Sequence, residues 1–338
     1  MVTVVKGSIW AANNTLGYIS VTDNPYLAVG DGVTDNTAAF NAALAAGKPV
    51  FVPTGTFLVG QLVIPSGAVL FGLGADSIVE LKNGVDLPLL SLSAVTNITV
   101  KHITLNGNKA NQTGVGIHAV AVAGGSGHVL ESLYIVNSLG DGINVNGGAT
   151  DIQILTPKIT GFVKSGITIE NASDIDIISA RTYNSDPAAF PGDGITLAPT
   201  ASTNLVSGVR VIGGYSDSNV GRGFSAVGNG SQNVINCTVS DYYAKSNTSH
   251  GIHILTATQI MISNVIAKSN GGDGIRFEGN TTNINATNGI ADSNTGYGAR
   301  EVVSGSTPNY NDFIGCRAVN NVGSNVITKV GANSNILG

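Results

Sequence analysis

A short recurring motif constrains the fold of this chain more than any other feature. The motif is Asn-x-(Gly/Ser)-x-Gly followed by Ile, Phe or Ala, and its clearest copies begin at Asn219, Asn247, Asn270 and Asn294. We call the residue before the second glycine the marker; the markers are Val115, Asp141, Ser165, Asp193, Arg222, His250, Asp273, Tyr297 and Ser324. They lie 23 to 29 residues apart. A repeat of this length indicates a solenoid of stacked units.

The segments between the markers are typical of short strands. Ile252-His253-Ile254, for example, alternates apolar and polar side chains, which predicts a strand with one buried face. We therefore predict an all-β chain, a right-handed parallel β-helix solenoid with about nine coils spaced ~4.8 Å apart. The 45 glycines would supply left-handed turns, and the motif asparagines would stack as a ladder. Cys237 and Cys316 are expected to be buried free thiols.

A helix is predicted near the N-terminus, where residues 31–46 contain a turn followed by helix formers. Thr34 or Asp35 would be its N-cap, and Phe40 and Leu44 would share one face. Because a solenoid leaves open strand edges at its ends, we expect this N-terminal capping α-helix to cover one of them. We predict one domain over residues 1–338, with N-terminal strands and the cap helix in 1–60 and the coils in 61–338.

Charge and hydropathy exclude several functions. The chain is 11% charged with a net charge of −5, and no block of Lys and Arg is available to neutralise phosphates, so nucleic acid is not an expected partner. The apolar runs are too short for membrane insertion, and no signal peptide is visible at the N-terminus. We expect no required cofactor, although the many Asp and Asn oxygens make calcium a candidate ligand.

The N-terminal region resembles a known superfamily. Residues 30–40 (GDGVTDNTAAF), 50–57 (VFVPTGTF), 62–67 (LVIPSG) and 72–74 (GLG) are similar to the signature of the pectate-lyase-like right-handed parallel β-helix superfamily. That superfamily includes phage tailspike depolymerases, polysaccharide lyases and hydrolases, and alginate epimerases. The resemblance implies a polysaccharide substrate, an extracellular or virion (phage tail) location, and a homotrimer if the chain is a tailspike. No catalytic motif carries over: only Asp186-Pro187 matches the epimerase Asp-Pro-His-Glu motif, and the paired aspartates of polygalacturonases are missing.

The repeat predicts which side chains share one lateral face of the solenoid. If the residue two positions after each marker points inward, those three and five positions after it point outward. The first outward set is His118, Asn144, Thr168, Thr196, Ser225, His253, Arg276 and Arg300, and the second includes Asn146, Glu170 and Glu278. Charge gathers on this face between residues 193 and 300. We predict as catalytic residues Asp193, His250, Asp273, Arg276 and Glu278, and as substrate-binding residues Asp141, Asp186, Arg222, His253, Tyr297 and Arg300.

Two kinds of chemistry fit these residue types. Glycoside hydrolysis needs two carboxyl groups about 5–9.5 Å apart, for which Asp186 with Asp193 or Asp273 with Glu278 are the candidates. A lyase or a uronate C5-epimerase needs a cation to neutralise the uronate carboxylate and a base to remove the adjacent proton; the arginines, histidines and Tyr297 suit this role. The alternatives are a non-catalytic glycan-binding tailspike or adhesin, and a solvated face whose charges pair between coils. An extended, acidic polysaccharide is the expected substrate.

Overall fold

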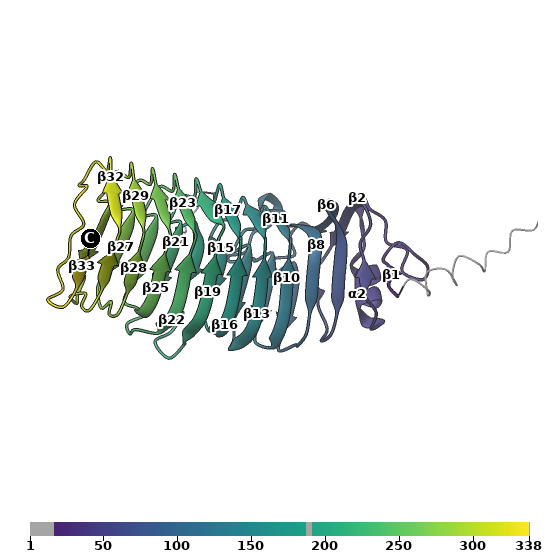
Figure 1. Cartoon of the computed structure of the whole chain (residues 1–338). Coiled ribbons are helices and arrows are strands. Elements are labelled where there is room, and N and C mark those ends of the chain that lie inside the picture. The colour runs from purple at the N-terminus through teal and green to yellow at the C-terminus, as the bar shows by residue number, and fades with distance from the viewer. Residues whose placement is uncertain (1–16, 187–190, 338) are drawn as a thin grey trace, which may run out of the picture.

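The chain is a rod of stacked coils in the computed structural model, which describes residues 17–186 and 191–337. Figure 1 shows the coils following one another from helix α2 at one end to strand β33 at the other. Neighbouring coils pair in parallel throughout the named ladders, and the predicted right-handed parallel β-helix is confirmed.

Each regular coil contributes one strand to each of three ladders. The first ladder consists of β10 (Ser126–Glu131), β13 (Ala149–Leu155), β16 (Ala172–Ile178), β19 (Val206–Ile212), β22 (Val234–Ser240), β25 (Thr258–Ser263), β28 (Asn285–Thr287), β31 (Asp312–Ile314) and β33 (Asn335–Leu337). The second consists of β11 (Tyr134–Val136), β14 (Lys158–Thr160), β17 (Arg181–Tyr183), β20 (Tyr215–Asp217), β23 (Tyr243–Lys245), β26 (Ile266–Lys268), β29 (Ile290–Asp292) and β32 (Arg317–Val319). The third consists of β5 (Leu62–Val63), β7 (Leu90–Ser93), β9 (Val120–Ala123), β12 (Ile143–Asn146), β15 (Ser165–Ile169), β18 (Asp193–Leu197), β21 (Phe224–Val227), β24 (Ile252–Leu255), β27 (Ile275–Glu278) and β30 (Ala299–Val302).

The N-terminal part is less regular. Its elements are β1 (Ile19–Ser20), β2 (Asp31–Asp35), α2 (Thr37–Ala45), β3 (Val50–Phe51), β4 (Gly55–Val59), β6 (Val69–Leu81), β8 (Thr99–Asn106) and the 3-10 helix η1 (Lys109–Asn111). The long strand β8 pairs with both β10 and β11, so the first two ladders begin there as one sheet.

Apolar side chains fill the inside of the rod because one face of every strand points there. In the third ladder, Ile195, Phe224 and Ile252 lie in register and are fully buried. Stacking identical or similar side chains every coil gives a continuous core, which a single coil could not bury alone.

Residues in the left-handed backbone conformation form corners of each coil, and successive corners within a coil lie five residues apart. Asp151, Thr156 and Gly161 have φ of 54°, 49° and 68°, and the same spacing recurs at residues 174, 179 and 184 and in the following coils. Most of these corners are Asn, Asp or Ser rather than Gly, since short polar side chains tolerate this conformation. The expectation that glycine makes the turns is therefore only partly right.

The motif glycine after each marker has a steric role instead. Gly274 has no left-handed φ, but a Cβ there would lie 2.6 Å from the Cβ of Ala291 and 2.6 Å from the carbonyl oxygen of Gly298. Gly251 is crowded in the same way by Ala267 and by Gly274 itself. The repeat therefore keeps glycine where adjacent coils approach most closely.

We expect Gly274→Ala to lower the free energy of unfolding by about 1–3 kcal/mol, because the methyl group overfills a packed contact between coils. Gly60→Ala is the control, since the nearest atom to a Cβ there is the Thr37 hydroxyl at 3.4 Å. Urea denaturation of both variants measures the effect. Equal midpoints would contradict the steric role.

The predicted asparagine ladder is confirmed. The Asn270 Oδ1 accepts the backbone N–H of Asn247 at 3.1 Å and its Nδ2–H at 3.0 Å. The Asn294 Oδ1 does the same for Asn270, and Asn321 for Asn294. The asparagine ladder lies inside the turns that lead from the second strand ladder to the third, directly before strands β24, β27 and β30.

Helix α2 occupies the predicted segment, but its N-cap is Asn36 rather than Thr34 or Asp35. The Asn36 side chain bonds Val29 instead of capping, while the Asp35 Oδ1 accepts the N–H of Thr37 at 3.0 Å. Phe40 and Leu44 are buried as predicted. The helix contacts β4 and β5; its role as a cap and the single-domain division stay predictions.

Two further expectations concern the cysteines and the membrane. Cys237 and Cys316 are both free, and the first is buried while the second is half-buried. Within the described ranges, no helix has the length and apolar character needed to cross a bilayer.

Candidate functional site

The third ladder carries the polar column that the repeat predicted. Asn144, Thr168, Thr196, Ser225, His253, Arg276 and Arg300 are partners in register from one coil to the next. Glu278 lies in the flanking column, between Leu255 and Val302. The alignment is confirmed from Asn144 onward. The expected exposure is not, because Asn144, Thr168, Thr196, Ser225 and His253 are all buried.

The predicted alignment was wrong for its first coil. Strand β9 pairs Ala121, not His118, with Asn144, so His118 occupies the marker position and Val115 lies in an exposed loop. The inward pair Val120 and Val122 sets this register. The glycines around Val115 merely imitate the motif.

Three marker aspartates share one arrangement. The Oδ1 atoms of Asp141, Asp193 and Asp273 each accept the backbone N–H of the next coil's marker residue, at 2.9, 2.7 and 2.8 Å. Asp141 and Asp193 also accept hydrogen bonds from side chains of the polar column, namely Thr168 and Ser225. All three carboxylates are at least 98% buried. They therefore bond the next coil from below the surface, and their predicted catalytic or substrate-binding roles stay predictions.

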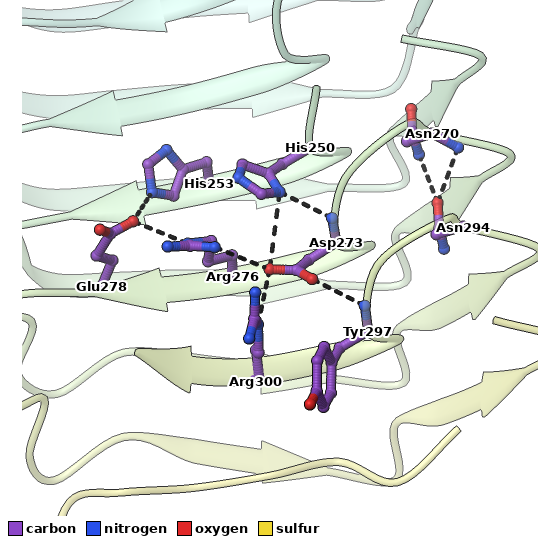
Figure 2. A network of polar contacts seen from close by, with 9 residues as sticks. All are labelled: His250, His253, Asn270, Asp273, Arg276, Glu278, Asn294, Tyr297 and Arg300. Atoms are coloured by element: carbon purple, nitrogen blue, oxygen red, sulfur yellow. Dashed lines mark hydrogen bonds and ion pairs between the residues drawn. The ribbon is translucent and has the colours of Figure 1, made fainter. Parts of the chain in front are cut away.

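Asp273 joins two arginines, as Figure 2 shows. Its Oδ2 accepts from the Arg300 Nε at 2.8 Å and from an Arg276 terminal nitrogen at 3.2 Å. The Arg300 guanidinium also lies 4.3 Å from the centroid of the Tyr297 ring. A guanidinium has five N–H donors, so Arg300 has more donors than its hydrogen bond to Asp273 uses.

Glu278 is the partly exposed acid of the cluster. Its Oε2 contacts the His253 Nε2 at 2.9 Å and the Arg276 Nε at 2.8 Å. The hydrogen bond from His253, reinforced by Arg276, lowers the pKa of Glu278 well below its usual range. Glu278 is consequently a carboxylate at neutral pH, and it holds both neighbours in place.

The two histidines are neutral at neutral pH. Burial, together with nearby His253, lowers the pKa of His250 to about 4, and burial also lowers the pKa of His253. The His250 Nδ1 accepts the backbone N–H of Asp273 at 2.8 Å. An accepting nitrogen carries no proton, so the neutral His250 ring carries its proton on Nε2.

The sequence analysis missed that this contact occurs twice. His118 accepts the backbone N–H of Asp141 at 3.1 Å, just as His250 does for Asp273. In both pairs the histidine lies 23 residues before the aspartate. This recurring spacing could have predicted the repeated contact from the sequence. The choice of Val115 as the marker hid it.

Four predicted site residues, Asp141, Asp186, Asp193 and Arg222, do not belong to the group around Asp273. Arg222 pairs with Asp193 in a neighbouring coil, at 3.5 Å. Asp186 forms an ion pair with Lys109 at 2.6 Å, and its expected partner Asp193 is bound elsewhere. Residues 187–190, which directly follow Asp186, lie outside the described residues.

We define the site cluster as the residues that the structure brings together, namely His250, His253, Asp273, Arg276, Glu278, Tyr297 and Arg300. Their roles in catalysis or binding stay predictions. In the part of the chain that the structure describes, no three His, Cys, Asp or Glu side chains form a potential metal site.

Comparisons with known proteins agree with this fold. Residues 18–86 match the family model "Rhamnogalacturonase A/epimerase, pectate lyase-like". The preneck appendage protein of Bacillus phage PZA is 30% identical over 204 residues, which are 51% of this chain and 24% of that protein. The chain thus spans about a quarter of the length of this relative.

Two solved structures superpose on most of the chain. The Azotobacter vinelandii mannuronan C-5 epimerase AlgE4 A-module has a TM-score of 0.64 at 16% identity, covering 94% of this chain and 100% of that one. The pre-mature gene product 12 of bacteriophage phi29 has a TM-score of 0.63 at 19% identity, covering 97% and 56%. The coil geometry and these superpositions show a right-handed parallel β-helix fold, and residues 18–86 are similar to the pectate-lyase-like family.

Proposed function

We propose that this protein acts on an acidic polysaccharide along the outer face of the third ladder, by lyase or epimerase chemistry at the site cluster. One observation carries the proposal. The guanidinium donors of Arg276 and Arg300 and the neutral imidazole of His250 occur together, on three successive coils. A uronate carboxylate would be neutralised by the arginines. Removal of the adjacent proton then becomes easier, because the charge that develops is stabilised.

The carboxyl groups of the cluster are poorly suited to hydrolysis. A glycoside hydrolase needs one protonated carboxyl group as a general acid. The lowered pKa of Glu278 keeps it ionised, and the Asp273 carboxylate is buried under two arginines and a backbone N–H. Neither group is free to donate a proton to a leaving oxygen.

Two groups remain for proton transfer. The His250 Nε2–H can donate to a substrate oxygen, since its Nδ1 is already occupied by Asp273. The half-buried Tyr297 side chain lies beside the Arg300 guanidinium, and we assign its phenolate form the role of proton acceptor, which becomes the phenol on taking up the proton. His253 and Glu278 act as positioning residues for Arg276.

The test is a panel of polysaccharides with two readouts, new reducing ends and ultraviolet absorbance of unsaturated products. We expect His250→Ala and Tyr297→Phe each to lower kcat by about 10²-fold or more, as is typical for a lost proton-transfer group. Arg210→Ala is the control, because Arg210 pairs with Asp176 on the first ladder. Full activity in both site variants would sink the assignment, and reducing ends without new absorbance would indicate hydrolysis. Isomerised uronates without cleavage would indicate an epimerase.

A second candidate is glycan binding without turnover, by a tailspike or an adhesin. The observation that favours it is charge balance: within the site cluster, Arg276 and Arg300 are matched by Asp273 and Glu278. No product from any glycan, together with retention on an acidic one, would select this function. We propose a virion surface as the location of the protein, which its similarity to the phage PZA appendage protein supports, and a homotrimer there stays a prediction.

A further inference from the structure

A column of tyrosines and cations runs along the outside of the second ladder, away from the site cluster. Tyr134, Lys158, Arg181, Tyr215 and Tyr243 are partners in register on five successive coils. Tyr183 lies beside them on the same strand as Arg181. Four of the nine tyrosines of the chain thus gather on one face.

The two cations of this column are adjacent and uncompensated. Lys158 and Arg181 are direct partners between β14 and β17, and like charges directly opposite each other destabilise a strand pair. Both side chains are exposed. Among residues 17–186 and 191–337, neither forms an ion pair with a carboxylate, although such pairs are found for many other cations.

In the neighbouring column of the same ladder, by contrast, the lysines form ion pairs. Lys245 pairs with Asp217 at 3.6 Å, and Lys268 pairs with Asp292 at 3.0 Å. Each of these lysines therefore has an aspartate as a partner in register. The exception at Lys158 and Arg181 calls for an anion from outside the chain.

The tyrosine rings hold these cations in position. The Lys158 Nζ lies 4.8 Å from the Tyr134 ring centroid and 5.7 Å from that of Tyr183. The Arg181 guanidinium lies 5.6 Å from the Tyr215 ring centroid. Cations over aromatic faces are favourable, and the Tyr183 hydroxyl raises the pKa of Lys158. The pair is thereby preorganised without being neutralised.

We propose that this column, with Lys158 and Arg181 at its centre, is a second binding surface for an acidic polysaccharide, separate from the site cluster. The two cations lie on adjacent coils, a spacing that suits a chain whose carboxylates repeat along its length, and the phenol groups can hydrogen bond sugar hydroxyls. The inference rests on the proposed function for its ligand class. It adds a surface that would keep a long substrate on the rod between events at the site cluster.

The experiment measures binding of the full chain to immobilised polygalacturonate, with dextran as the neutral reference, at low and high salt. We expect the double variant Lys158→Ala/Arg181→Ala to bind roughly tenfold more weakly at low salt, the effect of losing two exposed ion pairs. The matched control is Lys245→Ala/Lys268→Ala, which removes the same charge from compensated positions. It should bind like the original protein.

Three outcomes would overturn the proposal: equal binding by both double variants, no binding of the original protein to polygalacturonate, or a change of oligomeric state in the Lys158/Arg181 variant by sedimentation. The last outcome would make the column an interface between copies. Failure of the proposed function looks different, since the original protein would then give no product while its binding still depended on Lys158 and Arg181. Conversely, His250→Ala should lose turnover but keep this binding.

Discussion

Replacing Asp273 by alanine should lower the free energy of unfolding by about 3–5 kcal/mol, the usual cost of removing one member of a buried charge group. The carboxylate is 99% buried and is shared by Arg276, Arg300 and the backbone N–H of Tyr297. Without it, two guanidinium groups face each other on adjacent coils with only Glu278 to offset them. Chemical denaturation followed by circular dichroism measures the change.

The control for this prediction is Asp292→Ala. Asp292 pairs with Lys268 at 3.0 Å near the surface, where such a pair contributes up to about 1 kcal/mol. If the two variants unfold at the same denaturant concentration, Asp273 does not hold the coils together. Asp273→Asn should fall between them, because it keeps an acceptor for Tyr297 but not the charge.

The second large effect is expected for Asn270→Ala in the asparagine ladder. The substitution removes the acceptor of the Asn247 N–H and side-chain amide, and the donor to the Ala244 carbonyl and to Asn294. Each buried polar group left without a partner costs about 1–3 kcal/mol. We therefore expect a loss of at least about 3 kcal/mol in the free energy of unfolding.

Asn285→Ala provides the matched comparison for the ladder. Asn285 is half-buried on β28, and within the described residues its side chain makes no hydrogen bond, so its loss should change stability by less than about 0.5 kcal/mol. Thermal and urea unfolding of both variants decides the matter. A ladder variant as stable as Asn285→Ala would show that the asparagines follow the coil geometry instead of fixing it.

The sequence was sufficient for the fold because the motif marks the points where coils touch. Asn270 and Gly274 occur in it since an amide must bond the next coil and a side chain would collide with it. The same marker alignment correctly brought His253, Arg276 and Arg300 into one column. It failed at Val115, where glycines of an irregular loop match the motif without its contacts.

The sequence repeat could not predict which side chains of the site are buried. Strand alternation separates inside from outside, but it does not say which outward side chains the next coil covers. Asp193 and Asp273 point away from the apolar core and are still buried, because Arg222 and Arg300 fold over them. Likewise, Tyr134, Lys158 and Arg181 have no recognisable motif, so their common column emerges only from strand pairing.

The five-residue spacing of the left-handed corners has a consequence for where this rod can change its length. From the first corner to the third, as in Asp151 to Gly161, each full coil uses the same stretch of chain. All variation in repeat length must therefore fall in the remaining arc, which contains the third ladder and the connections on either side of it. Added loops can enter there without disturbing the first two ladders, so new specificity can be built onto the face of the site cluster while the scaffold keeps its geometry. Grafting a loop between β18 and β19 should be tolerated, whereas one extra residue between Thr156 and Gly161 should shift β14 out of register.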